Sequence, residues 1–245
     1  MQHATPILLA MSIFSIAANA DTNTVTDVFQ APNGKTVAFT CIKHASLRIQ
    51  YDGLEIQVDP VSALDPATDY SAFPKADLVL VTHEHFDHFD KEAVATLRKE
   101  GSAVYANPAV QGMLGYGTAL KNGDGATFRE DVSIEAVPAY NTTPGREKFH
   151  PKGRDNGYVL SLGGFRVYIA GDTEDIPEMK DVKNVDVAFL PVNQPYTMTP
   201  EQAAKAARVI KPKVLFPYHY GQTLIRKVSD LLSGSGIDMR IRNYQ

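Results

Sequence analysis

The sequence predicts an α/β (α+β) protein in which a sheet-on-sheet core is flanked by helices. Residues 77–82 read Asp-Leu-Val-Leu-Val-Thr, a nearly continuous apolar run that is typical of a strand buried on both faces. Residues 77–106 follow a strand–helix–strand order, which indicates a β-α-β unit. Residues 158–170 show a hairpin pattern around Gly163-Gly164, so strands lead the second half of the chain as well.

The remaining strands follow from apolar and β-branched runs that are separated by turn residues. Asp52-Gly53 and the segment 122–125 (Asn-Gly-Asp-Gly) are the clearest turns outside the hairpin. The strands expected from these patterns cover residues 37–42, 46–51, 54–58, 77–82, 102–106, 132–137, 158–162, 165–170, 186–192 and 214–220, the last of them broken by Pro217.

Capping residues mark two helices. Asp90 predicts the N-cap of a helix over residues 91–100, which would stop at Gly101. Thr199 predicts the N-cap of a second helix, because Pro200 suits its first position and Gln202 can complete a capping box. Between the strands lies a long polar loop, residues 141–156, and a loop of that length in a compact domain is commonly functional.

Composition excludes several classes of protein. With 44% hydrophobic and 21% charged residues among 245, the chain is neither disordered nor of low complexity and can bury a sizeable core. Its single cysteine, Cys41, excludes a disulfide framework and a Cys-rich zinc finger. The formal net charge of −4 gives no support for nucleic-acid binding.

Residues 1–20 have the pattern of a secretory signal peptide. They contain no charged side chain other than His3, and a mostly apolar run precedes Ala18-Asn19-Ala20, which fits a small-x-small cleavage site. An uncleaved anchor is the alternative, although the run is short for a membrane span. We therefore expect a signal peptide over 1–20, one domain over 21–245, a periplasmic or secreted protein, and no stable membrane insertion after cleavage.

A dense polar cluster follows the buried strand. His83, His85, Asp87 and His88 fall within six positions, and such groups cost stability unless they have partners. Alternating side chains at a strand end can point to one place, so His83 and His85 can chelate one ion while Asp87 and His88 face a neighbouring ion. Imidazole and carboxylate ligands suit Zn(II), Fe or Mn. A metal site is therefore predicted in preference to a solvated polar turn.

The sequence His-x-His-x-Asp-His after an apolar strand resembles the signature of the metallo-β-lactamase superfamily of metal-dependent hydrolases. Further segments resemble the motifs of that family in the same order, namely residues 43–47, 58–60, 168–173 and 217–221. Residues 195–200 are similar to the branch of Zn-dependent hydrolases related to the ascorbate-lactonase-like group. The resemblance covers residues 37–222 and implies a four-layer αββα sandwich with the metals at one edge of the sheets.

The same resemblance implies two divalent metal ions, with Zn(II) expected and Mn or Fe as alternatives. Its ligand set would be His83 and His85 for the first ion, Asp87, His88 and His219 for the second, and Asp172 as the bridge. Asp87 is also assigned the catalytic role. The alternatives are a turn or helix cap for Asp172 and a structural core histidine for His219.

The third ligand of the first ion is less clearly indicated by the sequence. Many relatives have a histidine after Thr-Pro-Gly, whereas this chain has Thr143-Pro144-Gly145-Arg146. His150 lies in the same long loop, and His44 is the one other unassigned histidine after residue 20. We place His44 within a strand among apolar neighbours, where a supporting role is favoured, and therefore expect His150 to be the ligand.

The resemblance then implies a hydrolase in which a metal-bridging hydroxide cleaves an ester or lactone, amide or phosphodiester bond of a small molecule. Asp59 is expected either to orient a ligand imidazole or to cap a turn. Tyr140, Asn193, Tyr196 and Tyr220 follow strand ends, where each either donates a hydrogen bond to developing negative charge or serves in packing.

Other functions remain as alternatives. An exported β-lactamase-like enzyme is disfavoured, because the β-lactamase branches that the chain resembles do not use a bridging aspartate equivalent to Asp172. A nuclease is disfavoured because the sequence has no Lys/Arg cluster. A non-catalytic metal-binding or partner-binding protein of the same fold is disfavoured by the completeness of the ligand set.

Overall fold

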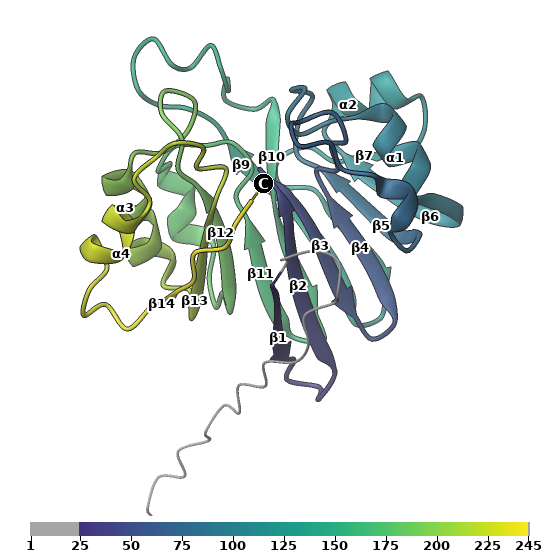
Figure 1. The fold of residues 1–245 in the computed structure, drawn as a ribbon, viewed down its shortest axis with the longest axis horizontal. Coiled ribbons are helices and arrows are strands. Elements are labelled where there is room, and N and C mark those ends of the chain that lie inside the picture. The colour runs from purple at the N-terminus through teal and green to yellow at the C-terminus, as the bar shows by residue number, and fades with distance from the viewer. Residues whose placement is uncertain (1–24, 245) are drawn as a thin grey trace, which may run out of the picture.

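In the computed structural model, residues 25–244 are described, and within them fourteen strands form two seven-stranded sheets that pack face to face (Figure 1). The first sheet contains, in spatial order, β1 (Thr26–Gln30), β2 (Thr36–Lys43), β3 (Ser46–Tyr51), β4 (Leu54–Val58), β5 (Ala76–Val81), β6 (Arg98–Ala106) and β7 (Thr118–Ala119). The second contains β14 (Asp238–Met239), β13 (Val214–Tyr218), β12 (Val187–Pro191), β11 (Phe165–Ile169), β10 (Asp155–Leu162), β9 (Val132–Ala139) and β8 (Gly125–Arg129).

Helices cover the outer face of each sheet, which completes the predicted four layers. Helices α1 (Lys91–Leu97) and α2 (Pro108–Leu114) lie on the first sheet, and α3 (Pro200–Ile210) and α4 (Arg226–Leu231) lie on the second (Figure 1). Two short 3₁₀ segments, η1 (Tyr70–Ala72) and η2 (Pro177–Asp181), add to these outer layers. In the part of the chain from 25 to 244, no helix is long and apolar enough to cross a membrane. The predicted signal peptide, residues 1–20, lies outside the described residues.

Each sheet changes from antiparallel to parallel pairing along its width. Strands β1 to β4 pair antiparallel and β4 to β7 pair parallel, and the second sheet repeats this change at β11. The loops that follow β5, β9, β11 and β13 carry His83, His150, Asp172 and His219. These residues meet at one end of the sandwich.

The alternation of side chains in β5 explains why its sequence is apolar throughout. Leu78 and Leu80 pack in the core between the two sheets, whereas Val79 and Val81 pack with Val94 of α1 in the outer layer. A strand with helix on one face and sheet on the other has no solvated side, so the prediction of burial on both faces is confirmed.

Local signals located most elements, but the helix predicted over 91–100 is three residues too long. Asp90 does cap α1, accepting from the backbone N–H groups of Glu92 and Ala93. The helix then ends at Leu97, because Arg98 pairs with Ala76 of β5 and begins β6. Gly101, which was expected to end the helix, therefore lies within this strand.

Two further expectations need correction. Pro217 does not break its strand, because it lies within β13 at a position that pairs with β12. On the other side, β14 pairs only with residues 214 and 215, so no strand there needs a hydrogen bond from the N–H that proline lacks. His44 does not lie within a strand. It occupies the turn between β2 and β3 with a φ of 49°, in the left-handed region.

Candidate metal centre

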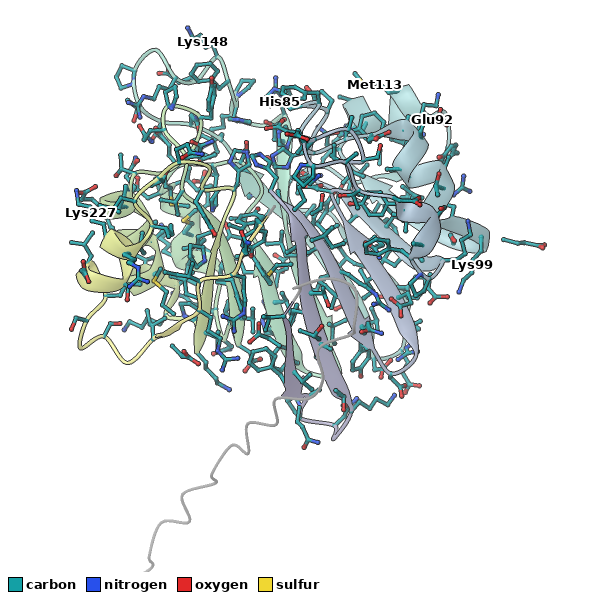
Figure 2. All side chains as sticks on the ribbon, in the orientation of Figure 1. His85, Glu92, Lys99, Met113, Lys148 and Lys227 are labelled. Atoms are coloured by element: carbon teal, nitrogen blue, oxygen red, sulfur yellow. The ribbon has the colours of Figure 1, made fainter. Side chains whose placement is uncertain are left out.

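The predicted histidine cluster lies at one end of the sandwich, between the two sheets. His83, His85, Asp87 and His88 follow β5 directly, and Figure 2 shows His85 at this end of the molecule, beside the loop that carries Lys148. His83 and His88 are fully buried, whereas His85 and Asp87 are partly exposed. The centre therefore opens to solvent on the side of His85 and Asp87.

The structure brings together all seven residues predicted as ligands. His83, His85 and His150 form one group in which one nitrogen of each lies within 4.8 Å of the others; we call it the first donor group. Asp87, His88 and His219 form the second donor group, in which His44 also meets the same distance limit. His150, rather than His44, thus completes the first group, as the sequence predicted, and His44 lies on the opposite side.

Asp172 lies between the two groups. Its Oδ1 is 3.2 Å from His88 Nε2, and its Oδ2 is 3.3 Å from His150 Nε2 and 3.2 Å from His219 Nε2. Glycine at position 171 allows the backbone to place Asp172 here. The φ of Gly171 is 65°, and a Cβ on this residue would lie only 2.6 Å from the carbonyl oxygen of Asn156. The carboxylate thus contacts members of both groups, which is the arrangement expected of a bridge.

Buried polar partners fix the orientation of three imidazoles. Asp59 accepts hydrogen bonds from Thr82 Oγ1 at 2.7 Å and from His88 Nδ1 at 2.8 Å. Because the Thr82 hydroxyl donates to Asp59, it accepts from His83 Nδ1 at 2.9 Å. These bonds place the proton on Nδ1 in both histidines and leave Nε2 free to act as a ligand.

His150 is held in the same way by a residue that sequence reasoning missed. Its Nδ1 donates to Asp155 Oδ2 at 3.0 Å, and Asp155 begins β10. Arg154 fixes Asp155 in turn through its Nε and Nη2. A carboxylate five residues after a loop histidine is a weak signal in sequence, because nothing there shows that the loop folds back on itself.

The electrostatic environment differs between the two groups. Burial lowers the pKa of His83 and of His85, assisted at His85 by the positive charge of Arg154, so both imidazoles are kept neutral. In the second group, burial alone would lower the pKa of His88 and His219, but the Asp172 carboxylate raises both, that of His219 to about 9. The second group thus lies in a negative field that favours a cation.

The donor set fits divalent metal ions. His88 Nε2, Asp172 Oδ1 and His219 Nε2 are buried side-chain atoms that make no hydrogen bond among the described residues, although they lie close to one another. Buried polar atoms normally have hydrogen-bond partners, and unpaired lone pairs that converge on one space are what a metal ion would satisfy. Imidazole nitrogens together with carboxylate oxygens are suitable ligands for such an ion.

Among the other residues singled out from sequence, Asp59 orients an imidazole and is not merely a turn cap. The hydroxyl of Tyr140 donates to Glu178 and that of Tyr220 to the carbonyl of Arg242, so neither hydroxyl is directed to the centre. Tyr196 is exposed, and its carbonyl accepts a hydrogen bond from the side-chain amide of Asn141, whose backbone N–H donates to the carbonyl of His150.

Comparison with known proteins agrees with this site. Residues 38–219 match the sequence model of the β-lactamase superfamily domain. The chain belongs to this superfamily. A UPF0173 metal-dependent hydrolase from Methanopyrus kandleri is 34% identical over 196 residues, which are 74% of this chain and 83% of the relative.

Two solved structures extend the likeness to three dimensions. One, described as a metal-dependent hydrolase from Parabacteroides distasonis, has 58% identity and a TM-score of 0.88, covering 91% of this chain and all of the other. Igni18, a metallo hydrolase from Ignicoccus hospitalis, has 27% identity and a TM-score of 0.71, covering 85% of this chain and 95% of the other. The protein is therefore a metal-dependent hydrolase with the metallo-β-lactamase fold.

Proposed function

We propose that this superfamily member is a dinuclear hydrolase whose centre holds two divalent ions. His83, His85 and His150 would bind the first ion and Asp87, His88 and His219 the second, with Asp172 between them. The observation that carries the proposal is the position of Asp172, whose Oδ2 lies within 3.3 Å of a histidine nitrogen in each group. When bound there, such ions would supply a nucleophilic hydroxide near neutral pH and would polarise the bond to be cleaved.

The chain's own contribution is to hold the donors rigidly and to exclude water. His83, His88, His150, Asp172 and His219 are at most 2% exposed, so their geometry is set by packing and by their hydrogen bonds. His85 and Asp87 are partly exposed, so substrate would approach the centre from their side. Phe86 lies between these two residues in sequence and is 79% exposed, which places an apolar side chain beside the opening.

The reaction proposed is hydrolysis of an ester or lactone, amide or phosphodiester bond in a small molecule. Among the described residues, Asn193 and Tyr196 remain as candidates to donate a hydrogen bond to the substrate, since the hydroxyls of Tyr140 and Tyr220 are engaged elsewhere. The all-N/O donor set supports Zn(II) as the native metal, with Mn and Fe as the alternatives.

Export is proposed from sequence alone. Residues 1–20 carry the pattern of a signal peptide, and a protein purified from its native host would then begin at residue 21 and be found in the periplasm or the medium. A mature chain that still begins at Met1 and stays in the cytoplasm would contradict this proposal.

Metal analysis and a substrate panel test the function. Purified full-length protein under metal-replete conditions should contain close to two ions per chain. Chromogenic esters, lactones, phosphodiesters and a cephalosporin then sort the bond classes. His85→Ala should abolish hydrolysis, while Met113→Ala, a change on the exposed surface of α2, should not. Hydrolysis that survives His85→Ala would show that it arises elsewhere.

A further inference from the structure

His44 contacts two residues of the second donor group at three points. Its backbone carbonyl accepts the N–H of His219 at 3.0 Å. Its Nε2 donates to Asp87 Oδ2 at 3.1 Å, and its ring centroid lies 3.7 Å from that of His219. The turn between β2 and β3 thus carries a side chain that reaches both Asp87 and His219.

Among the described residues, His44 is the single hydrogen-bond donor to the Asp87 carboxylate. The other close group is His219 Nε2, which lies 3.5 Å from the same oxygen, Oδ2. Asp87 lies in an irregular loop and is partly exposed, so its side chain is not fixed by burial. Without His44, the carboxylate would be free to turn toward solvent.

The backbone at this contact is unusual in both partners. His44 has a φ of 49° and His219 a φ of 47°, and a non-glycine residue in the left-handed region is held there only when its surroundings require it. The hydrogen bond from the His219 N–H to the His44 carbonyl joins these two residues directly. The strained turn is therefore coupled to the position of His219.

Each of the other oriented ligands forms a hydrogen bond with a residue outside the ligand set, which we call its outer partner. His88 is held by Asp59, His83 by Thr82 and His150 by Asp155. By the same pattern, the outer partner of Asp87 is His44, which also packs against the ring of His219 and accepts its backbone N–H. Its Nε2 proton is given to Asp87, and a nitrogen that donates its proton does not at the same time offer a lone pair to a metal.

We propose that His44 is a positioning residue that holds Asp87 and His219 for the second metal ion and leaves the first site unaffected. This inference rests on the dinuclear function proposed above. Loss of an outer partner typically weakens metal binding 10- to 100-fold, so His44→Ala should lower the affinity for the second ion by about that factor.

Side-chain length provides a matched pair of variants. In His44→Gln, the longer amide can place an N–H about where Nε2 lies, so it should restore most of the affinity for the second ion. His44→Asn has the same chemistry but is too short to reach Asp87, and it should resemble His44→Ala. Because both variants keep a polar side chain in the turn, a difference between them reports the contact with Asp87 rather than a folding defect.

The experiment titrates full-length metal-free protein with Co(II), followed by visible absorption, and with Zn(II) against a competing chelator. The wild type should take up two ions. His44→Ala should keep the first affinity and lose 10- to 100-fold in the second, whereas His150→Ala should lose the first. Unchanged affinities in His44→Ala would overturn the role of His44. Equal losses in His44→Gln and His44→Ala, with one nitrogen ligand fewer in the Co(II) spectrum, would overturn it in favour of direct coordination. Uptake of a single ion by the wild type would instead refute the dinuclear function itself.

Discussion

Asp59 is the position where a change of one atom should have the largest effect on the centre. Its carboxylate is fully buried and accepts three hydrogen bonds, from Thr82 N at 2.7 Å, Thr82 Oγ1 at 2.7 Å and His88 Nδ1 at 2.8 Å. Oδ2 accepts the last two. Asp59→Asn is nearly isosteric but replaces one of the oxygens by an NH₂ group, which donates and does not accept.

The consequences for stability and for metal binding can be estimated separately. Hydrogen bonds to charged groups contribute about 1.5–3 kcal/mol each, so losing two would cost roughly 3–6 kcal/mol. Rotation of the Thr82 hydroxyl and a change of tautomer at His88 recover part of this loss, and we expect unfolding to be easier by about 2–4 kcal/mol. The tautomer change moves the His88 proton to Nε2, so the nitrogen that faces the centre can no longer act as a ligand.

We therefore expect Asp59→Asn to bind the second ion at least 10- to 100-fold more weakly, a loss of about 1.4–2.8 kcal/mol. Denaturant unfolding of the metal-free protein gives the stability, and chelator competition gives the metal affinity. Asp69→Asn is the matched control, because it makes the same chemical change at the exposed cap of η1, where a single oxygen accepts both hydrogen bonds from Ser71 and asparagine is an equally good N-cap. If Asp59→Asn bound both ions as tightly as the wild type, the orienting role assigned to Asp59 would be wrong.

Further predictions concern three residues of the scaffold, Gly171, Cys41 and Phe189. Gly171→Ala should lower the free energy of unfolding by more than about 2 kcal/mol and weaken metal binding, because a left-handed φ alone costs about 1–2 kcal/mol and the new Cβ would lie 2.6 Å from a backbone oxygen. The control is Gly34→Ala, which has open space around it and should show only the smaller cost of φ in thermal unfolding. Burial raises the pKa of the Cys41 thiol to about 12, so iodoacetamide at pH 8.5 should alkylate it only after denaturation, and fast alkylation of the native protein would contradict its burial. Because this thiol ionises near pH 8.5 in an unfolded chain, its contribution to stability should fall as the pH rises from there toward 12, and Cys41→Ala should not show that component. Phe189→Ala should cost about 3–5 kcal/mol in denaturant unfolding, since Phe189 is fully buried between the sheets against Phe39 and Phe216, while Phe86→Ala on the surface should change stability by under about 0.5 kcal/mol.

Sequence reasoning succeeded where the signal was local. The cap of α1 at Asp90 and the capping box of α3 at Thr199 and Gln202 occur as predicted, because their hydrogen bonds join residues two or three apart. The strands β3 and β4 match their predicted bounds, since alternation and the Asp52-Gly53 turn are also local. Helix α2 was not predicted, although Asn107 caps it, Pro108 occupies its first turn and Gly115 ends it.

Expectations were wrong where distant residues decided the outcome. Arg98 would extend a helix on local propensity, yet it pairs with Ala76, and the Lys99 side chain forms an ion pair with Asp77 at 2.6 Å. Both contacts join residues that are 22 apart in the chain, so neither can be predicted from the residues next to Arg98 and Lys99. The same holds for Tyr140 and Tyr220, whose hydroxyls were candidates for the centre until Glu178 and Arg242 proved to be their acceptors.

The sequence by itself determined which residue types could form the centre and the order of the elements that carry them. The spacing from His83 to His88 places several ligands in one loop, while His150 falls in the predicted loop 141–156, Asp172 follows a predicted strand and His219 falls near the end of another. Only the tertiary structure decided that His44 lies beside the second group, and which carboxylate holds which imidazole. Those choices depend on loops distant in sequence meeting at one end of two packed sheets, as when the His219 N–H bonds to the His44 carbonyl. The free energy that brings them together comes from burial of the core between the sheets rather than from the loops themselves.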